Sequence, residues 1–335
     1  MARYDFASDN VAGAMPEALD ALSRFNGGFE AGYGSDGVSR RAADLIREML
    51  GVDAEIWFTA SGTAANALAL GTLAAPHEAV VAHEASHVAT DETGAPGFFG
   101  SGLGIITLSG ASGRIDRQPL EEVLARPDQP HWQHPVALSL TQATEFGAVY
   151  AQAELEDLAA TARATGARIH LDGARMANAA ASGFDLKSIT RLGVDILVLG
   201  GTKAGSTPTE ALVLLDKSLG RRFGARLKHG GQLVSKARFL AAPWIGMLES
   251  GAWLARAAHA NAMAQRLATA MPFDLRHPVE ANGVFVEMDE ATLTRLRESG
   301  WFVYRFIDGS VRFMCSWATT PEAVDELAQT LRRLA

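Results

Sequence analysis

The sequence predicts an α/β protein with a mainly parallel, seven-stranded sheet in its larger part and a small α+β unit at its C-terminal end. Short β-branched runs alternate with Ala/Leu/Arg/Glu stretches of helical spacing, which is the pattern of βαβ units. After residue 243 the pattern changes, because a long helical run precedes short strands and helices. Several apolar runs end directly in small or polar residues, which puts candidate functional side chains at strand ends.

Seven apolar runs predict the strands of the larger sheet, at residues 55–60, 79–82, 104–108, 135–139, 168–171, 195–199 and 210–215. Stretches of helical spacing predict helices at residues 40–50, 63–73, 120–124, 153–165 and 186–192. The last part begins with one long helix over residues 244–270. It continues with strands at residues 283–287, 301–307 and 312–316 and with helices at 290–299 and 321–334.

The length of 335 residues favours two domains, and no glycine/serine linker or internal repeat separates them. We expect residues 16–243 to form a large domain, and residues 244–335 together with 1–15 to form a small, closely docked one.

Charge and composition exclude several classes of protein. Thirty lysines and arginines against 38 aspartates and glutamates give a net charge of −8, which argues against a nucleic-acid or membrane-surface partner. The single cysteine, Cys315, excludes an internal disulfide and favours a reducing compartment. There is no run of eighteen apolar residues and no N-terminal apolar leader, so a cytoplasmic protein is expected. No histidine/cysteine cluster has the spacing of a metal site.

Lys203 follows the apolar strand at residues 195–199 through a Gly-Gly-Thr turn. Such a lysine is either a solvated loop residue or a desolvated amine that forms a Schiff base. Asp172 ends the strand at residues 168–171, one βαβ unit earlier, so it would emerge close to Lys203 at the same edge of the sheet. A carboxylate beside a cofactor lysine would keep the pyridine nitrogen of pyridoxal phosphate protonated. The alternative for Asp172 is a helix N-cap.

Two further strands end in polar residues. Ser61, Gly62 and Thr63 follow the strand at residues 55–60 and begin a helix, where backbone N–H groups can cradle a phosphate or simply carry an ordinary cap. His83 and His87 follow the strand at residues 79–82. A histidine there can stack on a cofactor ring, act as a base near neutral pH, or lie exposed in a loop.

These motifs make the chain resemble the low-specificity L-threonine aldolases, which are pyridoxal-phosphate-dependent lyases with an aspartate-aminotransferase-like fold of type I. The resemblance covers almost the whole chain, at residues 5–10, 33–36, 61–66, 87–92, 141–145, 170–175, 200–203 and 230–236 and at Arg312. It implies that the large domain binds pyridoxal 5'-phosphate.

The resemblance also implies a role for each matching residue. Lys203 would form the Schiff base, Asp172 would pair with the pyridine nitrogen, and His87 would stack on the ring. The other cofactor-binding residues would be Ser61, Gly62, Thr63, Arg175, Thr202 and, from a neighbouring subunit, Lys228. The substrate-binding residues would be Ser8, Tyr33, Arg175 and Arg312, since a guanidinium grips a carboxylate bidentately. Without the resemblance, Arg175 would be part of an ion pair on a helix surface, Arg312 a charge at a strand edge, and Lys228 a solvated loop lysine.

The implied reaction is the reversible retro-aldol cleavage of L-threonine or L-allo-threonine to glycine and acetaldehyde, by an aldehyde-lyase. The base that takes the β-hydroxyl proton stays open among His87, His83, Asp91 and His134. The same motifs fit two alternatives, a β-eliminating lyase on this fold and a non-catalytic binding protein.

The resemblance implies a homodimer or homotetramer with shared active sites, acting on a small amino-acid substrate. The chain departs from the family at one place. The family commonly has Gly-Gly-Thr-Lys-Asn-Gly, whereas this chain has Ala204 and then Ser-Thr-Pro-Thr at residues 206–209. We expect this difference to change the loop after Lys203.

Overall fold

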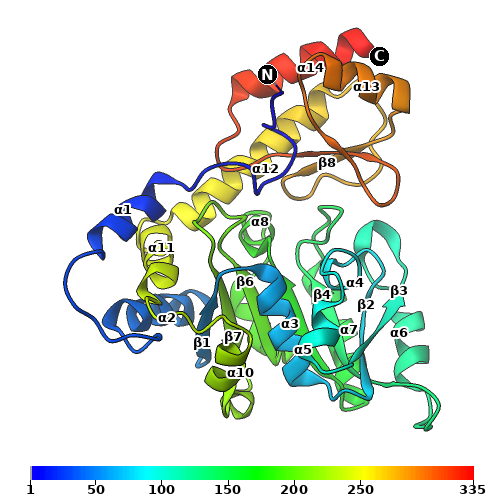
Figure 1. Ribbon diagram of the computed structural model, residues 1–335. Coiled ribbons are helices and arrows are strands. Elements are labelled where there is room, and N and C mark those ends of the chain that lie inside the picture. Colours follow the sequence, from blue (N-terminus) through cyan, green and yellow to red (C-terminus); the bar gives the residue numbers. More distant parts are fainter. Residues whose placement is uncertain (1) are drawn as a thin grey trace.

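The computed structural model describes residues 2–335 and contains two sheets (Figure 1). The larger sheet has seven strands in the order β1-β7-β6-β5-β4-β2-β3. Their bounds are β1 (Glu55–Thr59), β2 (Glu78–His83), β3 (Gly104–Leu108), β4 (His134–Thr141), β5 (Arg168–Gly173), β6 (Ile196–Gly200) and β7 (Glu210–Leu214). Only β7 runs antiparallel to its two neighbours, β1 and β6. The predicted seven-stranded, mainly parallel sheet is therefore confirmed.

Helices cover both faces of this sheet because its strands are apolar on both sides. In β6, Leu197 and Leu199 pack into one core, while Ile196 and Val198 pack into another. The first core is closed by α2 (Gly37–Leu50), α6 (Arg117–Leu124), α7 (Gln152–Ala164), α8 (Met176–Ala181), α9 (Ile189–Leu192) and α11 (Arg238–Glu249). The second is closed by α3 (Gly62–Leu73), α4 (His87–Thr90) and α10 (Phe223–His229). A strand that is buried on both faces, such as β6, therefore has a continuous run of apolar residues in the sequence.

The smaller sheet has the order β8-β10-β9 and is antiparallel throughout. Its strands are β8 (Gly283–Val286), β9 (Tyr304–Arg305) and β10 (Val311–Met314). It packs with α12 (Ala252–Ala270), α13 (Glu290–Glu298) and α14 (Pro321–Leu334), and both chain termini lie beside it (Figure 1). Phe6 lies in the same core, where its ring is 5.6 Å from that of Trp301. The small α+β unit is thus present, and an N-terminal segment packs on it.

Two predicted elements of the C-terminal part differ clearly in the structure. The long helix expected over residues 244–270 is two helices, α11 and α12, and Gly251 between them is left-handed with φ of 73°. Helix α11 begins before the predicted boundary and runs through Pro243, which is buried together with Trp244. Burial therefore outweighs the missing N–H of a proline within a helix. The strand expected at 301–307 shortens to β9.

Helices α1 (Pro16–Arg24) and α5 (Ala95–Phe99), like α4, α8 and α10, were not among the predicted helices. The division of the chain into domains at residue 243 stays a prediction. In the described part of the chain, no helix combines the length and the apolar character needed to cross a membrane.

Candidate active site

A cavity of about 240 Å³ lies at the carboxyl edge of the larger sheet. Most of the residues that line it follow β1 or β2, or lie on or directly after β5 and β6. They include most of the cofactor residues predicted from sequence: Ser61, Gly62, Thr63, His87, Asp172, Thr202 and Lys203. These positions are far apart in the chain but adjacent in space, because parallel strands bring their carboxyl ends to one edge. Asn10, Asn66, Ala174 and Glu210 also line the cavity.

Lys203 lies in the turn that follows β6, and Asp172 pairs with Val198 on that strand. The expected proximity of the two strand ends is therefore present. The turn is held from β7 by Glu210, whose Oε2 accepts a 2.7 Å hydrogen bond from the Gly201 N–H. Burial raises the pKa of Glu210 to about 6. Ala204, at the point where the chain departs from the family, is buried.

Helix α3 presents its N-terminus to the cavity. Ser61 is its N-cap, and its Oγ accepts a 3.3 Å hydrogen bond from the Ala64 N–H. A Cβ added at Gly62 would meet no atom within 4 Å, so the backbone there faces open space. The first N–H groups of a helix have no intrahelical acceptor, and together with the helix dipole they attract an anion. The ordinary cap and the anion site therefore exist together.

Asp172 is 2 % exposed, and both of its carboxylate oxygens accept hydrogen bonds. Asn66 Nδ2 donates to Oδ2 at 2.9 Å, and the Ala174 N–H donates to Oδ1 at 2.9 Å. Asn66 Nδ2 also donates to Glu92 Oε1 at 2.9 Å, and Glu92 Oε1 lies 3.0 Å from His87 Nδ1. A continuous polar network therefore joins His87 to Asp172 behind the wall of the cavity.

Arg175 is buried and is held by two acidic residues. Its Nε and Nη2 donate to the two oxygens of Asp9 at 2.8 and 3.1 Å, and its Nη1 donates to Glu145 at 3.4 Å. Burial works against the charged form of both partners. The charges of Arg175 and Lys203 nevertheless lower the pKa of Asp9 to about 2, and Asp9 and Glu145 raise the pKa of Arg175. Asp9 was not among the predicted site residues.

Removing the carboxylate with Asp9→Ala should lower the free energy of unfolding by about 3 to 5 kcal/mol, because it leaves a buried guanidinium without its bidentate partner. Denaturant unfolding at pH 7 measures this loss. Asp325→Ala, which removes an exposed partner of Arg266, should lower the free energy of unfolding far less, because solvent screens an exposed ion pair. Since the pKa of Asp9 is lowered, the pair stabilises the fold above about pH 4, and this stability is lost as the pH falls towards 2. Equal losses in the two variants would contradict the prediction.

Arg312 on β10 carries a second guanidinium, which lies close enough to Arg175 for the two positive charges to interact. Burial lowers the pKa of Arg312, and the positive charge of Arg175 lowers it further. Its Nη2 donates one long hydrogen bond of 3.5 Å to the Ala7 carbonyl, and its Nε is buried without an acceptor among the described residues. In contrast to Arg175, Arg312 therefore has unused donors. Ser8, beside Asp9, accepts a hydrogen bond from the Asn10 N–H at 3.2 Å.

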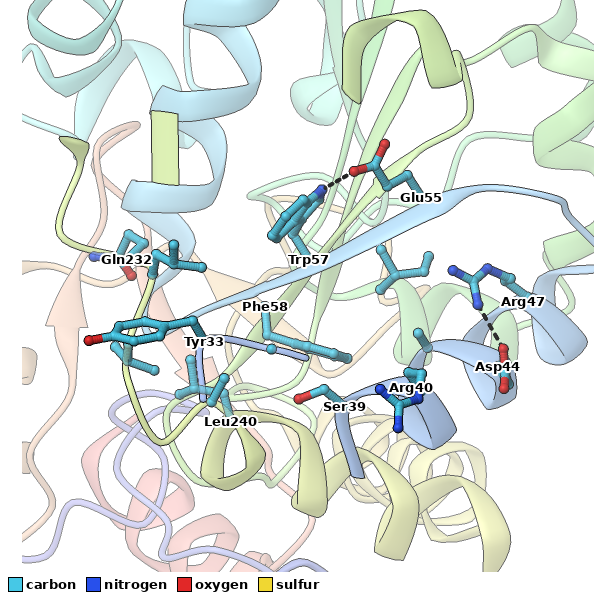
Figure 2. A pocket seen from close by; sticks show the side chains of 16 residues that line it. Tyr33, Ser39, Arg40, Asp44, Arg47, Glu55, Trp57, Phe58, Gln232 and Leu240 are labelled. Carbon is cyan, nitrogen blue, oxygen red and sulfur yellow. Dashed lines mark hydrogen bonds and ion pairs between the residues drawn. The ribbon is translucent and has the colours of Figure 1, made fainter. Parts of the chain in front are cut away.

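Tyr33 and Lys228 lie away from Lys203 in this chain. Tyr33 lines a second cavity of about 360 Å³, where Figure 2 shows it beside Gln232. Lys228 Nζ lies 4.8 Å from the centre of the Tyr33 ring. The two cavities flank Ala60, whose N–H donates to Gln232 Oε1 at 2.9 Å. The structure thus does not bring these two predicted residues into the Lys203 cavity of their own chain.

The structure narrows the choice of base. His134 begins β4, at the amino end of that strand, where it pairs with Glu78, so the structure does not bring it into the Lys203 cavity. His83 is buried, its Nδ1 accepts from the Ala85 N–H at 3.0 Å, and its Nε2 lies 3.1 Å from the Gly110 carbonyl, so both of its nitrogens are engaged. His87 lines the cavity, and Asp91 is exposed at the end of α4.

Comparisons with known proteins agree with this arrangement. The family model described as beta-eliminating lyase matches residues 5–291. Low-specificity L-threonine aldolases of a Pseudomonas species and of Pseudomonas aeruginosa are 44% and 42% identical to the chain, each over 98% of this chain and 96% of the relative. The solved structure of Leishmania major threonine aldolase superposes with a TM-score of 0.93 at 30% identity, covering 99% of this chain and all of that one. An aspartate aminotransferase from Thermus thermophilus, 17% identical, shares the fold with a TM-score of 0.73 over 97% of this chain and 89% of its own. The chain belongs to the beta-eliminating lyase family.

Proposed function

We propose that the protein is an aldehyde-lyase that cleaves L-threonine, L-allo-threonine and related L-β-hydroxy-α-amino acids to glycine and an aldehyde, with pyridoxal 5'-phosphate as cofactor. The observation that carries the proposal is the meeting of Lys203, Asp172 and the N-terminus of α3 in one cavity. The near-full-length relatives named as low-specificity L-threonine aldolases support the choice of reaction.

The groups around the cavity fit this cofactor chemically. The open backbone at Gly62 and the N-terminus of α3 suit a phosphate, and the buried carboxylate of Asp172 suits a protonated ring nitrogen. Lys203 supplies the amine, and Ser61, Thr63 and Thr202 supply hydroxyl groups around the same space. When bound, pyridoxal phosphate supplies an electron sink for the pair of electrons released at the substrate Cα.

The two arginines would divide the recognition of the substrate carboxylate. Arg312 offers donors that the protein does not use, and it lies close enough to Arg175 for their charges to interact. Arg175 would be aligned by Asp9 and Glu145, so that its contribution is a fixed positive charge. Ser8 would add a hydroxyl next to Asp9.

Near the β-hydroxyl of the substrate, the structure leaves His87 and Asp91 as candidates for the base. His87 lines the cavity, while the negative charge of Asp91 reaches Arg312. Either group would take the β-hydroxyl proton directly or through one water molecule as the Cα–Cβ bond breaks.

The site would be completed by a second copy of the chain, in a homodimer or homotetramer. Tyr33 and Lys228 match residues that line the family's active site, yet in a single chain they lie beside the second cavity. We therefore assign them to the active site of a neighbouring subunit, where Lys228 would face the phosphate.

The test is a product analysis of the purified protein, supplied with pyridoxal 5'-phosphate and L-threonine. We expect glycine and acetaldehyde in equal amounts. A β-eliminating enzyme would instead release a 2-oxo acid and ammonia, and a binding protein would release neither. Comparing L-threonine, L-allo-threonine and phenylserine then gives the substrate preference.

Replacing the free guanidinium with Arg312→Lys should raise the KM for L-threonine by about 10- to 100-fold, because an ammonium cannot form two parallel hydrogen bonds to a carboxylate. The measurement is steady-state kinetics at saturating cofactor. Arg305→Lys on neighbouring β9, an exposed partner of Glu290, is the matched control and should leave KM unchanged. An unchanged KM in the Arg312 variant would argue against this role.

A further inference from the structure

We propose that Glu92 is a positioning residue that fixes the proton of His87 on Nδ1 and leaves Nε2 free to accept a proton, and that Asn66 joins this pair to Asp172. The catalytic part of this inference rests on the proposed function. Neither Glu92 nor Asn66 is among the site residues predicted from the sequence.

The geometry places Glu92 behind His87. The His87 side chain is 27 % exposed and lines the cavity, whereas the Glu92 side chain is fully buried. Only Nδ1 of the imidazole has a polar partner in the described structure, Glu92 Oε1 at 3.0 Å. The carboxylate therefore approaches the histidine from the side opposite to that available to a ligand, which is how a carboxylate orients a general base.

The hydrogen bonds of Asn66 determine the direction of the network. Its Nδ2 lies 2.9 Å from Glu92 Oε1 and 2.9 Å from Asp172 Oδ2. An amide nitrogen has two hydrogens, so both carboxylates act as acceptors. With the amide reversed, its oxygen would face two carboxylate oxygens. Glu92 Oε1 therefore accepts a hydrogen bond from Asn66. We infer that the same oxygen also accepts from His87, which places the proton of the imidazole on Nδ1.

The charges around His87 favour the same arrangement. The hydrogen bond to Glu92 raises the pKa of His87, while burial and Lys203, from the turn after β6, lower it. Glu145, after β4, adds a further negative charge that raises the pKa. Burial raises the pKa of Glu92, and the nearby charge of Asp172 on β5 raises it further. Glu92 Oε2 is buried with no hydrogen-bond partner among residues 2–335.

This arrangement makes proton uptake by His87 favourable. A buried carboxylate without a cation is costly, and protonation of His87 at Nε2 converts it into a neutral ion pair. The shared amide of Asn66 also keeps Asp172 and Glu92 from facing each other directly. His87 is thereby held at the cavity by Glu92 as a base with a defined tautomer.

The first test uses the protein without added cofactor. In Glu92→Gln we expect the pKa of His87, followed by NMR titration of its ring signals, to fall by about one to two units. Glu92→Asp keeps the charge and should restore most of the difference. Glu84→Gln, an exposed change on the same stretch of chain, should leave the titration unchanged. An unaltered His87 titration in Glu92→Gln would overturn the inference.

The second test is the pH profile of threonine cleavage. For Glu92→Gln we expect kcat to fall by about 10²- to 10⁴-fold with little change in KM, and the acidic limb of kcat/KM to move to lower pH. Asn66→Ala should give a smaller change in the same direction. A loss of thermal stability with an unshifted limb would mean that Glu92 only supports the fold. If the NMR shift is found in a protein that does not cleave threonine, the proposed function fails while the His87–Glu92 pairing stands.

Discussion

Lys203→Ala abolishes the cleavage of L-threonine, with an expected loss in kcat of at least about 10⁴-fold. Among the described residues, Lys203 is the lysine that lines the cavity of its own chain, and it lies in the turn after β6. The same substitution should remove the visible absorbance band that the wild-type protein acquires with pyridoxal 5'-phosphate and that moves when glycine is added. Absorbance spectra and turnover of acetaldehyde, recorded on the same preparation, measure both effects.

Lys217→Ala is the matched control for this substitution. Lys217 is half exposed and pairs with Asp53, and it follows β7, which begins at the cavity and runs away from it. We expect full activity and an unchanged band. If Lys203→Ala keeps the band or more than a trace of turnover, the assignment of the cofactor lysine is wrong.

Asp172→Asn should lower kcat by about 10³-fold while the protein still binds the cofactor through Lys203. The buried carboxylate supplies the negative charge that a protonated ring nitrogen needs, and an amide does not. Both oxygens of Asp172 accept hydrogen bonds, from Asn66 and from the Ala174 N–H, so an Asn in this place must turn its NH₂ group towards one of these donors. The substitution therefore removes the negative charge and one hydrogen bond at the same place.

Asp128→Asn controls for the change in net charge, because Asp128 is exposed and does not line the cavity. We expect this variant to keep the wild-type kcat. The informative measurement is kcat together with the spectrum of the cofactor-loaded protein. A variant with normal kcat would remove Asp172 from the proposed site. A variant that no longer acquires the band at all would point to a role in binding instead.

The local sequence pattern was enough to predict the strands of the larger sheet and the residues that directly follow them. A strand such as β6 is buried on both faces, so its apolar composition is enough to identify it as a strand. The polar turn that follows β6 then identifies Lys203 as a residue at the strand end. Asp172 and the N-cap Ser61 were predicted in the same way, from their positions at the ends of apolar runs. Local pattern could not reveal that α11 continues through Pro243 or that Gly251 separates α11 from α12, because burial against distant elements decides both.

The position of His134 outside the Lys203 cavity has a similar cause. Its sequence neighbourhood indicates a strand, but which end of that strand faces the site depends on pairing with β2 and β5. Tyr33 and Lys228 lie together in the structure, beside the second cavity and outside the Lys203 cavity of the same chain. The sequence does not show this separation, because it results from tertiary packing. For Tyr33, the residue type and the motif match did not indicate which copy of the chain it serves, whereas the resemblance already implied a neighbouring subunit for Lys228.

The sequence by itself therefore determined the fold class, the ends of the strands and the chemistry of the cavity, since these depend on hydrophobic periodicity and on residues next to the strands. The tertiary structure alone decided the strand order, the antiparallel direction of β7, and the partners of the buried charges. Asp9 meets Arg175 across 166 positions, and Asn66 meets Asp172 across 106. Such pairs leave no local signal, because a buried charge is stabilised by whichever opposite charge or donor the folded chain brings to it.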